Sequence, residues 1–99
     1  MVDRRQSPRI ARTVPLTLSG SEMLVPAESS VINAHGALII SPKPFYAGAQ
    51  LVVTNRKNKE VVNAWVVRSS PSADKPGKFD LGVQFQEPSP KFWGNDYTV

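Results

Sequence analysis

Apolar and polar residues alternate along much of the chain, which is the pattern of β-strands that bury one face. The clearest alternation covers residues 79–86. Its apolar positions are Phe79, Leu81, Val83 and Phe85, and the polar positions between them include Asp80, Gln84 and Gln86. We therefore predict a strand with Leu81, Val83 and Phe85 buried and with Asp80 and Gln84 more exposed.

Shorter apolar runs predict further strands over residues 14–19, 27–32, 37–40, 51–54 and 61–67. Polar or proline-containing stretches separate them, at residues 42–48, 55–59 and 70–77. Because Pro15 has no N–H for a ladder hydrogen bond, its strand is expected at an edge, or with the proline nitrogen facing outward. About six short strands at regular spacing predict an all-β fold, a small antiparallel six-stranded β-barrel.

Prolines and aromatic residues indicate the structure that follows the last predicted strand. Nine prolines leave little room for helix, and the best helical candidate is a short turn over residues 88–93. Ser89 would be its N-cap, with Pro90 at the first helical position. Phe92 and Trp93 would either seal one end of the barrel or form a docking patch, whereas Trp65, amid valines, is expected in the core.

The length of 99 residues fits one domain. We expect a single domain over residues 1–99, made of a flexible arginine-rich N-terminal loop (1–11), the barrel (12–87) and a C-terminal tail (88–99). No apolar run approaches the ~18 residues of a membrane span, and the polar start does not resemble a secretory signal. A soluble, cytoplasmic protein without a membrane partner is the expectation.

Composition argues against catalysis and for an anionic partner. Cysteine is absent and His35 is the sole histidine, so a thiol nucleophile and a histidine metal cluster are both excluded. The eight acidic residues are scattered without an obvious acid/base pair. The net charge is +4, and arginines crowd the N-terminus at Arg4, Arg5, Arg9 and Arg12. These features predict a binding protein for phosphates, nucleotides or nucleic acid rather than an enzyme.

Two segments carry the candidate chemistry. Residues 3–9 hold three arginines, and a guanidinium can grip a phosphate or the O6/N7 edge of guanine in bidentate fashion and stack on a base. The competing interpretation is a solvated basic tail. Residues 31–39 interrupt a strand pattern with Asn33 and Gly36, which indicates a tight turn where glycine takes a positive φ or permits close backbone approach. The competing interpretation there is a plain hairpin turn, with His35 solvated rather than stacked on a base.

Together these segments resemble the PilZ domain family, small β-barrels of which many are receptors for the bacterial second messenger cyclic di-GMP. The family's Arg-x-x-x-Arg motif is matched by residues 5–9, with Arg4 as an extra arginine, and its Asp/Asn-x-Ser-x-x-Gly motif falls on residues 31–36. The resemblance extends from about residue 3 to residue 85. It implies that cyclic di-GMP is the ligand, with no other cofactor, and that its binding residues are Arg4, Arg5, Arg9, Asn33, His35 and Gly36.

The second motif departs from the family pattern in two of its three defined positions. Val31 stands where an acid or amide hydrogen-bonds the guanine base, and Asn33 stands in place of the serine, which it can replace in part. Losing a hydrogen bond to a buried polar edge costs roughly 1–3 kcal/mol. We therefore expect a cyclic di-GMP receptor or adaptor of weakened affinity that presents its ordered loop to an unknown protein partner. The alternative is a degenerate PilZ domain that acts as a protein-interaction module, while nucleic-acid binding is disfavoured because the few aromatic residues fit the core.

Overall fold

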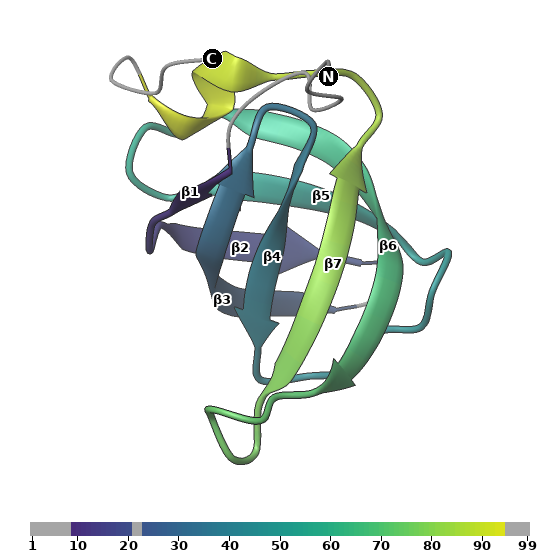
Figure 1. Cartoon of the computed structure of the whole chain (residues 1–99). Helices are drawn as coiled ribbons and strands as arrows, with labels where there is room; N and C mark the ends of the chain where they lie inside the picture. Colours follow the sequence, from purple (N-terminus) through teal and green to yellow (C-terminus); the bar gives the residue numbers. More distant parts are fainter. Residues whose placement is uncertain (1–8, 21–22, 95–99) are drawn as a thin grey trace, which may run out of the picture.

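The computed structural model describes residues 9–20 and 23–94, and within them the chain forms an all-β structure with one short 3-10 helix (Figure 1). The elements in chain order are β1 (Ile10–Ala11), β2 (Pro15–Ser19), β3 (Leu24–Asn33), β4 (Gly36–Ser41), β5 (Gln50–Asn55), β6 (Val61–Pro71), β7 (Phe79–Phe85) and η1 (Pro90–Trp93). The predicted helical turn is thus present, as a 3-10 helix.

The strands close into an antiparallel barrel. Each barrel strand pairs with two others in the order β3-β2-β5-β6-β7-β4, and the pairing of β4 with β3 completes the ring. β1 is a seventh, extra strand, which pairs with β3 through Ile10 opposite Ile32 and Ala11 opposite Val31. The prediction of a six-stranded antiparallel barrel is confirmed. Residues 10–11, which were expected in the N-terminal loop, form strand β1, because their backbone pairs with β3 beside the barrel.

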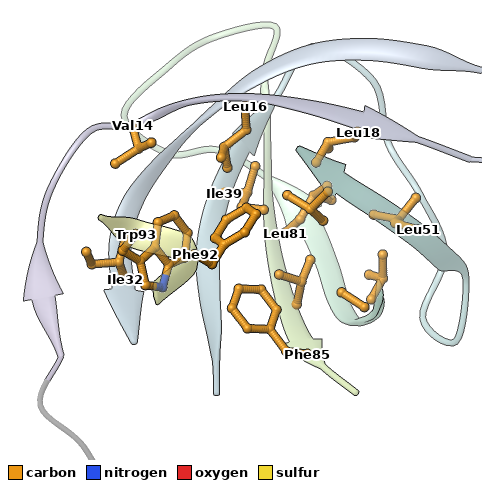
Figure 2. Packing of buried hydrophobic residues seen from close by; sticks show 14 of the residues in the cluster. Val14, Leu16, Leu18, Ile32, Ile39, Leu51, Leu81, Phe85, Phe92 and Trp93 are labelled. Carbon is orange, nitrogen blue, oxygen red and sulfur yellow. The ribbon is translucent and has the colours of Figure 1, made fainter. Parts of the chain in front are cut away.

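The core follows from the alternation of side chains along the strands. Buried apolar residues from the barrel strands point inward and meet the aromatic residues of η1 (Figure 2). On β7, Leu81, Val83 and Phe85 are buried, Gln84 is exposed and Asp80 is half-buried, as the alternation predicted. Along this strand, the apolar residues of the alternation are therefore those that face the barrel interior.

The helix η1 closes the end of the barrel that contains the β3–β4 turn (Figure 1). Phe92 and Trp93 are buried, and their ring centroids lie 4.7 Å apart in an edge-to-face arrangement. Phe85 stacks on Trp93 at a centroid distance of 5.9 Å. Of the two expectations for this aromatic pair, sealing of the barrel is correct. The Ser89 hydroxyl does not cap η1 and instead donates to the Glu87 carbonyl at 3.0 Å.

Two local expectations need correction. Trp65 is half-buried on the outer face of β6, because its neighbours Ala64 and Val66 are the inward positions, so it is not a core residue. Of the two placements expected for Pro15, the edge strand is wrong, because β2 lies between β3 and β5. Pro15 is its first residue, and its position at the start of the strand makes the missing N–H tolerable.

Candidate functional site

A hollow of about 400 Å³ lies on the outer face of the barrel, over the β3–β4 hairpin and the neighbouring strands β7 and β6. It is lined by Arg9, Val31, Asn33, His35, Gly36, Ala37, Leu38, Val67, Arg68, Gly82, Val83 and Gln84. Its volume lies within the range of small-molecule sites, and its lining mixes apolar and polar side chains as such sites do. Arg9 and the turn after β3 are distant in sequence, but both line this hollow.

The turn between β3 and β4 is held by the Asn33 side chain. The amide oxygen Oδ1 of Asn33 accepts a 2.8 Å hydrogen bond from the backbone N–H of His35. Such a bond across two residues is an Asx turn, and it stabilises a tight reversal of the backbone. Asn33 and Gly36 pair directly on either side of the reversal. The side-chain oxygen of Asn33 therefore has a structural task, a role that the sequence did not reveal.

The backbone carbonyls of this turn are bonded to the C-terminal part of the barrel. Three consecutive carbonyl oxygens each accept a 2.8 Å hydrogen bond: that of Asn33 from Trp93 Nε1, that of Ala34 from the N–H of Ser89, and that of His35 from the N–H of Phe85. Because the turn is held on its inner side, its outer side can serve as a fixed wall of the hollow. Fixed walls lower the ordering cost of binding a ligand.

Gly36 is required because of a close backbone approach. The glycines with positive φ among the described residues are Gly48, Gly77 and Gly94, so Gly36 does not belong to this group. A Cβ on Gly36 would overlap the backbone carbonyl of Val83 and would lie 3.2 Å from the Cα of Gln84. Of the two expectations for this glycine, close approach is the correct one. It lets β4 lie directly against β7 at the floor of the hollow.

Arg9 brings the first predicted motif to the second. It is exposed, it lines the hollow, and it directly precedes β1, whose Ala11 lies opposite Val31 of β3. The pairing of β1 thereby places Arg9 beside the turn. Arg4 and Arg5, the other arginines expected to bind ligand, lie outside the described residues, as does the rest of the loop over residues 1–8.

The sequence of residues 3–92 matches the family model described as PilZ domain. That match covers nearly the whole chain and includes both segments that meet at the hollow. The chain belongs to the PilZ domain family. The fold agrees: the structure of the Bacillus subtilis inhibitor of motility (MotI/DgrA) aligns with a TM-score of 0.69 at 21% sequence identity over 89% of this chain. This chain spans 44% of the length of that protein. No individually curated protein matches the sequence significantly.

In this PilZ domain the first position of the second motif is an apolar part of the hollow. Val31 is half-buried and lines the wall formed by β3, next to an irregularity in the β3–β4 pairing between Ser29 and Val31. A hydrocarbon side chain there offers no hydrogen bond to a base edge. The three predicted residues of the turn, Asn33, His35 and Gly36, all lie in the same wall.

The opposite wall contains residues that the sequence reasoning missed. Val67, Arg68 and Gln84 line the hollow from β6 and β7, and Val67 and Arg68 are exposed. The β6–β7 register shifts between Val66 and Arg68, so that Arg68 rather than Val67 lies opposite Gly82. Such a bulge redirects side chains and has no reliable sequence signature. The one sequence signal for this wall was the position of Arg68, a cationic residue directly after the apolar run 61–67.

Within residues 9–20 and 23–94, no group of three or more potential metal-ligating side chains occurs. No helix in these ranges has the length and apolar character to span a bilayer. The side chains that line the hollow offer guanidinium, amide and imidazole groups together with apolar surface.

Proposed function

We propose that this PilZ domain is a cyclic di-GMP receptor and adaptor of weakened affinity, with the ligand bound in the hollow beside the β3–β4 turn. The observation that supports the proposal best is the convergence of Arg9 and the turn residues Asn33, His35 and Gly36 on one hollow. The family supplies the ligand class. The domain would bind its ligand without catalysing a reaction. It would do so in the cytoplasm, where the second messenger acts.

Arginine chemistry explains how the binding energy would arise. Arg9 is exposed and joined to the barrel through β1, so its guanidinium can face a phosphate or a guanine edge without being desolvated beforehand. Charge-assisted bidentate contacts of this kind are the strong class of hydrogen bonds. Arg4 and Arg5, in the adjoining segment, would add to them. Ordering of that segment over the ligand would subtract from the affinity and would present a new surface to a protein partner.

Two features of the turn wall support the proposal that the affinity is weakened. Val31 provides hydrocarbon where the family provides an acid or amide, and the Asn33 oxygen is already bonded to the His35 N–H. Loss of a hydrogen bond to a buried polar edge costs roughly 1–3 kcal/mol, which is about one to two decades in Kd.

Calorimetric titration with cyclic di-GMP at moderate salt tests the proposal, with GTP and cyclic di-AMP as comparison ligands. Arg9→Ala should weaken binding by about 1.5–3 kcal/mol, the range for charge-assisted hydrogen bonds. Arg56→Ala removes the same charge at the exposed turn after β5, away from the hollow, and should leave Kd almost unchanged. Absence of any binding by the wild-type protein at millimolar cyclic di-GMP would rule the receptor out.

A second candidate is a degenerate PilZ domain that binds a protein partner without nucleotide. Val31 is one observation in its favour, and the exposure of large apolar residues is another. Met23, Leu24 and Tyr46 are 41%, 73% and 83% exposed, respectively. Exposed apolar groups are common at protein interaction sites. Under this reading the titration shows no binding, and Val31→Asp fails to restore it because the pocket is no longer adapted to the ligand.

A further inference from the structure

The side chain of Arg68 lies across β7 instead of extending straight into solvent. A Cβ placed on Gly82 would be 3.3 Å from Arg68 Cγ and 3.6 Å from Arg68 Nε. The side chain of Arg68 therefore occupies the space that the missing side chain of Gly82 leaves free. In the register, Gly82 lies between Arg68 on β6 and Leu38 on β4. This path directs the guanidinium over β7 into the hollow, where both Arg68 and Leu38 are lining residues.

The guanidinium of Arg68 is available for a ligand. Arg68 is exposed, and its side chain makes no hydrogen bond or ion pair with residues 9–20 and 23–94. The bulge at Val66–Arg68 places it opposite Gly82, so its position is set by the backbone and not by a side-chain partner. An arginine held flat against a sheet surface keeps its fork of donors and one π-face for planar ligands.

The wall formed by β3 and its turn lacks the acid or amide that the family pattern has at the position of Val31. Val31 is apolar, and the side-chain oxygen of Asn33 accepts from the His35 N–H. Recognition of guanine by that wall is therefore reduced compared with the family pattern. Arg68 brings to the same hollow a side chain suited to the edge of guanine that presents the acceptors O6 and N7.

We propose that Arg68, held over Gly82, is a residue by which this site selects guanine over adenine. This inference rests on the proposed function, and it assigns base selection to β6 and β7 instead of the turn. The guanidinium would donate two hydrogen bonds to O6 and N7 of one guanine base. Adenine has an amino group in place of O6. Because this amino group is a hydrogen-bond donor, adenine cannot accept both hydrogen bonds from the guanidinium.

Paired titrations with cyclic di-GMP and cyclic di-AMP test the assignment, because the two ligands share the phosphate ring and differ in the base. Arg68→Ala and Arg68→Lys should each weaken cyclic di-GMP binding by about 10- to 100-fold and change cyclic di-AMP binding much less, since a good bidentate contact discriminates between bases by about this factor. Lysine keeps the charge but lacks the fork. Arg56→Ala is the control for net charge.

Gly82→Ala tests the placement of Arg68 while the arginine itself remains. The new Cβ would be 3.3 Å from Arg68 Cγ, so the side chain must move. We expect a loss of guanine preference in the same direction as for Arg68→Lys, with a thermal midpoint close to that of the wild type, because only a flexible side chain has to yield. Wild-type affinity for both ligands in Gly82→Ala would contradict the placement.

The outcomes separate the two proposals. If the wild type binds cyclic di-GMP and Arg68→Ala and Arg68→Lys retain its guanine preference, the role of Arg68 is overturned and the receptor function stands. If the Arg68 variants weaken both ligands equally, Arg68 contacts phosphate and its selective role is wrong. If the wild type binds neither ligand, the receptor function fails, and base selection fails with it.

Discussion

The indole Nε1–H of Trp93 donates a 2.8 Å hydrogen bond to the backbone carbonyl of Asn33, across 60 positions of the sequence. Through this bond the aromatic plug of the barrel and the turn of the candidate site form one structural unit. The neighbouring bonds from Ser89 and Phe85 to the next two carbonyls strengthen the connection. A change in the plug is therefore expected to reach the turn.

Trp93→Phe tests this connection because it keeps an aromatic ring but removes the donor. The Asn33 carbonyl would lose this hydrogen bond in a partly buried position, and we expect a loss of about 1–3 kcal/mol in the free energy of unfolding. Urea denaturation measures the loss, and amide exchange at His35 should become faster. Trp65→Phe is the matched control: this indole lies on the outer face of β6, and its replacement should leave exchange at His35 unchanged.

Gly36→Ala should destabilise the barrel through steric overlap. The added Cβ would overlap the Val83 carbonyl, so β4 would have to move away from β7. Overpacking of this kind costs about 1–3 kcal/mol, which thermal unfolding detects. Gly20→Ala is a suitable comparison, since its Cβ would meet only side chains, at 3.4 and 3.7 Å. Equal midpoints for the two variants would refute the close-approach explanation.

Truncation of the β7 core residues should be strongly destabilising. Leu81 and Phe85 are 0% and 3% exposed, and both belong to the central cluster. Leu81→Ala should cost about 2–5 kcal/mol and Phe85→Ala about 3–5 kcal/mol because each leaves a cavity. Gln84→Ala, on the exposed face of the same strand, should change stability by no more than about 0.5 kcal/mol. Losses below about 1 kcal/mol for both core variants, well short of the cavity range, would show that the strand does not carry the core.

Val31→Asp should strengthen cyclic di-GMP binding. The half-buried side chain already lines the hollow, and a carboxylate there can accept hydrogen bonds from the guanine edge, for a gain of roughly 1–3 kcal/mol. Val67→Asp places the same charge on the opposite wall, close to Arg68, and should not improve binding. Calorimetry of both variants provides the measurement, and a tighter Kd for Val67→Asp than for Val31→Asp would contradict the assigned roles of the two walls.

Much of the fold could be predicted because alternation along a strand reports directly which face is buried. That signal held for β7, whose inward and outward residues are separated as expected. It failed for β6, where apolar residues occupy both faces. Trp65 points outward there, and the inward position beside it is Ala64, which lies opposite Phe85. A small residue is needed facing that ring, and this requirement becomes visible only when the strands are paired.

The candidate site was half predictable for a related reason. Arg9, Asn33 and Gly36 stand in local patterns whose spacing is visible in one dimension. Arg68 and Gly82 become neighbours only through the β6–β7 register and its bulge. Bulges arise from backbone pairing between distant segments and leave little trace in residue type. The wall formed by β6 and β7 therefore needed the three-dimensional structure.

The pairing of β4 with β7 also sets an order of events during synthesis. The β3–β4 and β5–β6 hairpins join neighbours in the chain, but the ring stays open until Phe79–Phe85 is available to lie between β6 and β4. Before that moment β4 presents an unpaired edge, which is the kind of surface that aggregates. As the ribosome adds residues one by one, this exposure lasts until β7 has left the exit tunnel. Slow translation just upstream of β7 is thus expected to lower the yield of folded protein more than an equal pause after Trp93.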